Sequence, residues 1–138
     1  MKEWVLYSTL ALFAWGLWAF LPKMALSCLD PKTAFMFEVI GGAVTGLLVL
    51  LILRPQLGGV ETRGIIPAVL TGVLGYLGLL FFMYAVRAGK ICVVAPVTAL
   101  YPVITLALAF VFLREKITIV QVAGIILALV SVVLISYE

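Results

Sequence analysis

The chain has 138 residues, of which 66% are hydrophobic and 11% charged, and its mean hydropathy is +1.33. Soluble domains are about 45–50% apolar and about 25% charged, so this sequence has too little polar surface to cover a soluble globule. The net charge of +3 comes from nine Lys and Arg residues scattered singly between apolar runs, which favours membrane topology over nucleic-acid binding.

Five apolar segments follow one another along the chain, and each has roughly the 20 residues that a membrane-spanning helix needs. They cover residues 4–22, 33–53, 65–86, 92–113 and 118–137. The segments lack the alternating polarity of membrane β-strands, and no soluble domain follows the first one as it would follow a signal peptide. The sequence therefore predicts an all-α membrane protein, a bundle of five transmembrane helices that forms one domain over residues 1–138.

Basic residues are divided almost equally between the two sides of the predicted bundle. The N-terminal side carries five and the opposite side carries four, and an excess of Lys and Arg marks the cytoplasmic side. The two sets are Lys2, Arg54, Arg63, Arg114 and Lys116 against Lys23, Lys32, Arg87 and Lys90. The small excess weakly predicts a cytoplasmic N-terminus in the cell membrane. Two interpretations stay open, a single orientation set by other signals and insertion in both orientations with pairing of inverted copies.

Small residues recur at helix-packing spacing in the second, third and fifth segments. Such residues let the backbones of membrane helices approach closely, so they mark candidate packing positions. These candidates are Gly42, Gly46, Gly72, Gly75, Gly124 and Ala128. The pattern indicates packed helices and points to no particular function.

Glu38 is the one carboxylate well inside an apolar segment. It lies five residues into segment 33–53, about 7–8 Å along the axis of a helix. Ionisable groups in membrane helices are costly and mark functional sites by default, so Glu38 is a candidate for proton coupling. The alternative, a Glu38 that reaches the interface or has a structural partner, stays equally open. Lys23 is expected to extend to the interface or to pair with Glu38.

Aromatic and hydroxyl side chains fall in the middle of the first, third and fourth segments. They commonly serve packing, but they also suit the walls of a cavity for small organic molecules. Pro102 lacks an N–H, so it leaves a carbonyl near Thr98 without a partner and predicts a kink in segment 92–113. The candidate cavity residues are Trp15, Trp18, Glu38, Tyr84, Thr98, Tyr101 and Pro102.

Groups that carry enzyme chemistry are missing from the sequence. It has no His, only two Cys, and neither a nucleophile–base pair nor a pair of catalytic carboxylates. We therefore expect no enzyme, no bound metal and no cofactor.

Several motifs in the second half of the chain occur together. The sequence FFMYA at 81–85 is followed by AG at 88–89, APVTALYPV at 95–103, FLREK at 112–116 and QVAG at 121–124. In combination these motifs resemble the EamA-like domain of the drug/metabolite transporter superfamily, although each alone is weakly specific. The resemblance covers all five segments and is strongest from Phe81 onward.

This resemblance implies a secondary transporter or exporter of small organic metabolites. Members typically have ten helices in two inverted halves with the substrate held between them, so this chain corresponds to one half. The expected partners are a second copy in an antiparallel homodimer or a separate five-helix half, together with membrane lipid and a small-molecule substrate, and no nucleic acid. Glu38 stands where many members are expected to carry a basic residue. The first segment also lacks the carboxylate of the distantly related small multidrug-resistance proteins.

The preferred hypothesis is a proton- or gradient-coupled exporter whose cavity is lined by the first four segments, with the fifth serving mainly in packing. Two alternatives stay open. One is an accessory membrane subunit that packs against a partner through its glycines and moves nothing itself. The other is a flippase of lipid-linked sugars.

Overall fold

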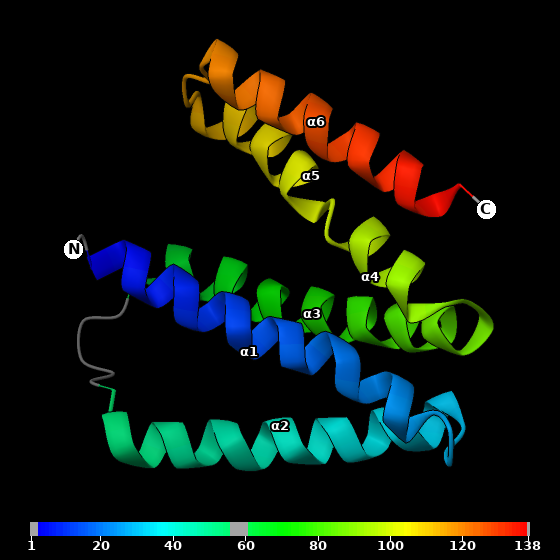
Figure 1. Cartoon of the computed structure of the whole chain (residues 1–138). Coiled ribbons are helices and arrows are strands. Elements are labelled where there is room, and N and C mark those ends of the chain that lie inside the picture. Colours follow the sequence, from blue (N-terminus) through cyan, green and yellow to red (C-terminus); the bar gives the residue numbers. More distant parts are fainter. Residues whose placement is uncertain (1–2, 56–60, 138) are drawn as a thin grey trace. The chain divides into compact units, whose positions relative to one another are not determined.

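A computed structural model describes residues 3–55 and 61–137 of the chain, and all regular structure in those residues is helical (Figure 1). The helices are α1 (Glu3–Ala25), α2 (Pro31–Leu53), α3 (Thr62–Ala88), α4 (Ile91–Thr98), α5 (Tyr101–Leu108), the π-helical turn η1 (Ala109–Leu113) and α6 (Ile119–Ser136). They make five spans long and apolar enough to cross a membrane, with α4, α5 and η1 together forming the fourth. The predicted fold class, an all-α membrane protein with five transmembrane helices, is confirmed. Lys2, used above for orientation, lies outside the described residues.

The first three helices extend beyond their apolar segments because polar residues at their ends continue or cap them. The carboxylate of Asp30 accepts the backbone N–H groups of Lys32 at 2.9 Å and Thr33 at 3.2 Å. Pro31 then occupies the first turn of α2, where a missing N–H leaves no hydrogen bond unmade. Glu38 consequently lies about 10 Å from the start of α2, deeper than the sequence predicted.

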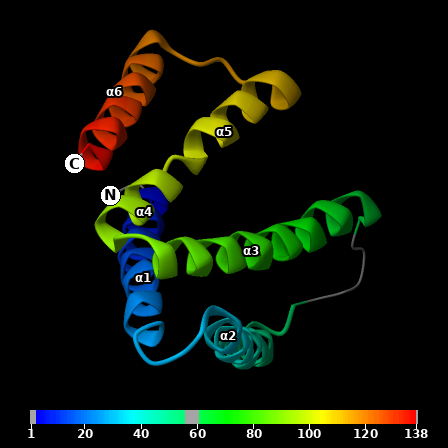
Figure 2. The same ribbon diagram turned by 90° about the vertical axis from the view of Figure 1, so that its right-hand side faces the viewer.

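The chain divides into two compact units, residues 1–88 and 89–138. In the first unit, α1 and α2 both pack against α3. The three helices splay, since α2 is seen nearly end-on in Figure 2 while α3 runs across the picture. They converge where α1 and α3 end and α2 begins, and the buried side chains of the described residues belong to that end. These are Pro22, Leu26, Ala34, Leu79, Phe82, Met83 and Val86.

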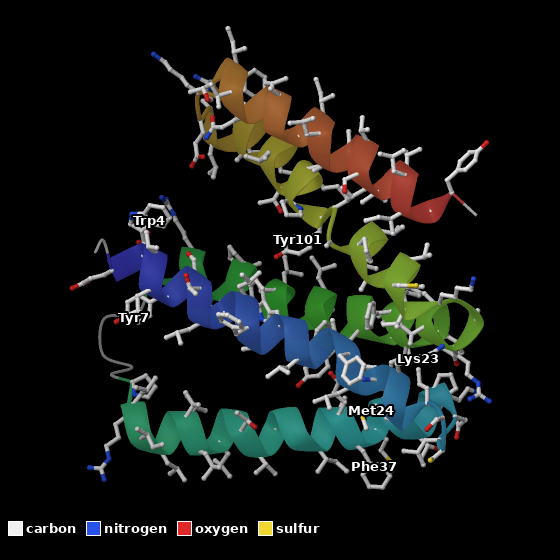
Figure 3. The ribbon with its side chains drawn as sticks, viewed as in Figure 1. Trp4, Tyr7, Lys23, Met24, Phe37 and Tyr101 are labelled. Carbon is white, nitrogen blue, oxygen red and sulfur yellow. The ribbon has the colours of Figure 1, made fainter. Side chains whose placement is uncertain are left out.

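Two cationic side chains join the C-terminal ends of α1 and α3 by hydrogen bonds. The ammonium group of Lys23 donates to the carbonyl of Val86 at 3.1 Å, and the guanidinium of Arg87 donates to the carbonyl of Leu26. These carbonyls lie at the C-terminal ends of α3 and α1, where helix carbonyls lack intrahelical partners and favour positive charge. Each cation therefore satisfies the end of the other helix, and we call these four residues the helix-end clamp. Figure 3 labels Lys23 at this end of α1.

In the second unit, α6 packs against α4, and none of the residues described between 89 and 137 is buried. The start of α6 is fixed by a capping box. The Thr118 hydroxyl accepts the Gln121 N–H at 3.3 Å, while the Gln121 side-chain oxygen accepts the Thr118 N–H at 2.8 Å.

The fourth span is interrupted rather than only kinked. Ala99 and Leu100, between α4 and α5, both have ψ of −2°, and the N–H of Leu100 bonds back to the Val97 carbonyl at 3.2 Å. Pro102 then lies in the first turn of α5, where proline is tolerated. A continuous helix would press the Pro102 ring against the Thr98 carbonyl, which accounts for a break at this point.

Candidate functional site

In the first unit, a carboxylate on α2 meets an indole on α1. The Nε1–H of Trp18 donates a hydrogen bond to Oε1 of Glu38. Phe37, the preceding residue on α2, is 56% exposed and points away from α1 in Figure 3. The rotation of α2 thus directs Glu38 toward α1 and its neighbour outward.

Ring contacts with α3 hold the aromatic side chains around this pair. Trp18 stacks on Phe82 with ring centroids 5.6 Å apart and planes 20° from parallel. Phe35 of α2 meets Tyr76 of α3 edge to face, at 6.3 Å and 87°. Offset stacking and edge-to-face contact are the favourable geometries for aromatic pairs. The indole is therefore held from α3 by its ring and from α2 by its N–H.

Gly42 allows the Tyr76 phenol to lie against α2. A Cβ atom at Gly42 would stand 2.8 Å from the Tyr76 hydroxyl oxygen, closer than real Cβ contacts come. The other glycines predicted for packing differ, because a Cβ at Gly46, Gly72, Gly75 or Gly124 meets no atom within 4 Å. Ala128 is exposed on α6. A packing role at these five positions stays a prediction.

These side chains line a cavity of about 310 Å³ in the first unit, which is open on one side. Its lining residues are Trp18, Glu38, Gly42, Gly72, Gly75, Tyr76 and Leu79. The carboxylate, the indole N–H and the phenol are its side-chain polar groups, and the rest is apolar. A mostly apolar cavity with a few convergent polar groups is the usual composition of a small-molecule site.

Two of the seven predicted cavity residues, Trp18 and Glu38, line this cavity, whereas Tyr76 and Leu79 were missed as lining residues. A signal for them exists in the sequence, since residues 72, 75, 76 and 79 recur at the spacing of one helix face. Trp15 and Tyr84 lie outside the cavity, with exposed fractions of 61% and 44%.

The remaining predicted residues, Thr98, Tyr101 and Pro102, lie together in the second unit at the break in the fourth span. The Thr98 hydroxyl donates back to carbonyls of its own helix, at 3.0 Å to Val94 and 2.9 Å to Ala95. Tyr101, labelled in Figure 3, begins α5 with an exposed ring. Thr98 thus satisfies carbonyls of the turn that precedes the break.

The second unit has its own cavity of about 310 Å³, between the start of α4 and the end of α6. Its lining residues are Gly89, Lys90, Val93, Val94 and Ser136, none of which the sequence singled out for a site. Within residues 3–55 and 61–137, no group of three or more His, Cys, Asp or Glu residues could hold a metal ion.

One of the comparisons with known proteins identifies the family of the chain. The sequence profile of the EamA-like transporter family matches residues 2–137. An uncharacterized protein from Methanocaldococcus jannaschii is 30% identical over 104 residues, which cover 73% of this chain and 76% of the relative. No solved structure matches the chain significantly.

Proposed function

We propose that this chain, which belongs to the EamA-like transporter family, is a secondary transporter that exports small organic solutes across the cell membrane. A proton gradient drives this export. The family is one of membrane transporters, and the five spans suit a multi-pass membrane protein. The observation that supports proton-coupled export of a small solute is the Trp18–Glu38 hydrogen bond at the wall of the first-unit cavity.

Glu38 is proposed as the group that takes up and releases the proton. A carboxyl group inside a membrane-spanning helix is a functional candidate by default. Glu38 lines a cavity large enough for a small solute, so solute and proton can act on the same group. Tyr76 is the other titratable residue of that cavity, and Lys23 and Arg87 are the charged residues at the convergent ends of α1 and α3.

The working form is proposed to be an antiparallel homodimer in which each chain acts as one EamA-like transmembrane domain. The five-to-four division of basic residues supports insertion in both orientations. Open space beside Gly46 and Gly124 supports the approach of a second chain, since small residues admit close helix contact. Inverted repeats around a central site are the general design of such carriers.

The test is flux through vesicles that contain only this protein. Vesicles loaded with a metabolite mixture should lose particular components when a pH gradient is imposed, as measured by mass spectrometry. The Glu38→Gln variant should fall to the rate of protein-free vesicles, because the amide cannot carry a proton. Glu115→Gln, which changes an exposed carboxylate in the connection after η1, is the matched control and should transport normally. Gradient-driven flux that survives in Glu38→Gln would overturn the coupling role.

An accessory subunit is the second candidate, and the same open glycines favour it. In that case the purified protein should move no solute under any gradient, and flux should appear only when a partner chain is added. Chemical cross-linking in native membranes then separates the two candidates, since a transporter dimer gives a self-linked product and an accessory subunit gives a mixed one.

A further inference from the structure

We infer that the first-unit cavity binds a monovalent organic cation with a flat apolar body. The inference deepens the proposed function and rests on it for its physiological meaning, because it names the class of solute. It is argued from the charge, the rings and the size of the cavity.

The charge of the cavity favours a cation. Glu38 is the one charged side chain among its lining residues. Lys23 and Arg87, the basic residues that end α1 and α3, donate to the carbonyls of the helix-end clamp. A carboxylate without a basic neighbour in a low-dielectric site attracts a positive ligand and repels a negative one. The cavity therefore disfavours carboxylate and phosphate solutes.

A metal cation fits this cavity poorly. Calcium and magnesium need six or more oxygen ligands, whereas the lining offers one carboxylate, one of whose oxygens accepts the Trp18 N–H. The second carboxylate oxygen remains available to accept a hydrogen bond from one N–H group. One available carboxylate oxygen is enough to bind an ammonium group, but it is too few ligands for a metal ion.

The aromatic side chains provide the second attraction. Trp18 and Tyr76 are each 41% exposed, so both rings retain accessible surface beside Glu38. Phe82 and Phe35 hold them in place, so that little side-chain freedom is lost when a ligand enters. Ring faces attract cations through their quadrupole, Trp most strongly. An ammonium group bound by the carboxylate thus enters a cavity in which two aromatic rings retain accessible surface.

The size of the cavity limits the body of the ligand. A volume of about 310 Å³ is near the lower end of the range for small-ligand sites. Gly72 and Gly75 line one wall, and a Cβ at either position would project into open space. With Leu79 they make an apolar wall without side-chain hydrogen-bonding groups, which suits a flat hydrocarbon or aromatic body.

The test compares three probes that share one ring and differ in charge. Benzylammonium, benzyl alcohol and benzoate are titrated at neutral pH into the full-length protein in detergent, and the indole N–H signal of Trp18 is followed by NMR after assignment with Trp18→Phe. Benzylammonium should shift that signal and bind about tenfold or more tightly than benzyl alcohol. Benzoate should leave the signal unchanged.

Substitutions test which residues bind the probes. Glu38→Gln should weaken benzylammonium binding by about 10- to 100-fold and leave benzyl alcohol unaffected. Glu115→Gln should bind as the wild type does. Gly72→Leu should fill the apolar wall and weaken both probes. Equal affinity for benzylammonium and benzyl alcohol, unchanged binding in Glu38→Gln, or no shift by any probe in the wild-type protein would each overturn the inference.

Failure of this inference is distinguishable from failure of the proposed function. If the protein binds benzylammonium selectively but produces no flux, the result supports the cation site and contradicts the proposed transport. If the protein instead moves neutral or anionic solutes along the gradient and does not bind benzylammonium selectively, the result supports the transporter and contradicts the cation site.

Discussion

The carboxylate of Asp30 lies in the connection between α1 and α2, outside the membrane-spanning segments. It receives the Thr33 hydroxyl and the backbone N–H groups of Thr33 and Lys32. These hydrogen bonds, that of the Thr33 side chain foremost, hold the pKa of Asp30 below its ordinary value. Because the folded protein binds this proton less readily than the unfolded chain, Asp30 stabilises the fold above the unfolded pKa. The contribution is lost as the pH falls through the folded pKa.

We therefore expect Asp30→Ala to lower the thermal stability of the detergent-solubilised protein at pH 7. The difference from the wild type should shrink as the pH falls below about 4, where the unfolded-state carboxyl is increasingly protonated. Circular dichroism melts between pH 3 and 7 measure it. Asp30→Asn is the control, since Asn caps helices without titrating and should keep a constant advantage over Asp30→Ala. A wild-type advantage that is independent of pH would contradict the assignment.

Single residues also show what the sequence could and could not predict of the site. The Asp30-Pro31 pair is a recognisable helix start, and it allows the depth of Glu38 to be calculated. That Trp18 would be the partner of Glu38 could not be predicted, because the period of each helix leaves its rotation against the next helix undetermined. The helix-face spacing places Tyr76 beside Gly72 and Gly75. It does not predict that the Tyr76 phenol lies against α2, which depends on the absence of a side chain at Gly42.

The fourth span combines three irregular features in one element. It has a break at Ala99 and Leu100, a proline in the first turn of α5, and the π-helical turn η1, which ends at Arg114 with a positive φ of 54°. Broken helices at membrane depth are tolerated where protein or a cavity covers the backbone, and they are common at transporter sites. The sequence predicted a kink from Pro102, but not the π turn, because no residue type marks a π-helix.

Replacing Pro102 tests whether the proline maintains the break. In Pro102→Ala the new N–H can bond to the Thr98 carbonyl, so a continuous helix through Ala99 and Leu100 becomes favourable. Amides in this stretch should then exchange with deuterium about fivefold more slowly, which corresponds to about 1 kcal/mol for one hydrogen bond. If the break serves transport, flux should fall as well.

The control for this experiment is Pro96→Ala, which removes the other proline of the span from within α4. Exchange at Ala99 and Leu100 should remain as in the wild type, because a proline ring crowds the carbonyl four residues before it, which for Pro96 is that of Cys92. Equal slowing in both variants would show that a general loss of proline, and not the location of Pro102, governs the break.

For the whole molecule, the number of spans and their approximate positions followed from the distribution of apolar residues along the chain, because about 20 consecutive apolar residues admit few alternatives to a membrane helix. Orientation did not follow, because the basic residues are nearly balanced. A balance of this kind predicts that a reporter fused to the C-terminus is found on both sides of the membrane. Topology reporters of opposite compartment specificity, such as a periplasmic phosphatase and a cytoplasmic fluorescent protein, measure the two populations.

Removing basic residues from one side of the bundle or from the other should shift the share of C-termini found on each side of the membrane. Arg63→Gln with Lys116→Gln leaves three basic residues against four, and Lys32→Gln with Lys90→Gln leaves five against two. The first pair should shift the C-terminus toward the cytoplasm and the second should shift it away. A reporter found in one compartment for the wild type and for both pairs would contradict dual insertion.

The helix-end clamp has a mechanical consequence for the first unit. Lys23 and Arg87 tie the ends of α1 and α3 together, whereas the same helices diverge toward their opposite ends. Helices joined at one end deform most easily by rotating about that end, so we expect the softest motion of this unit to be a movement of the divergent ends. Trp18, Glu38 and Tyr76 line the cavity between the helix-end clamp and the divergent helix ends. We therefore expect such a movement to widen the cavity while both cation–carbonyl hydrogen bonds are kept. A small change of angle at the helix-end clamp, next to the cavity, would thus become a large displacement at the far ends of the helices.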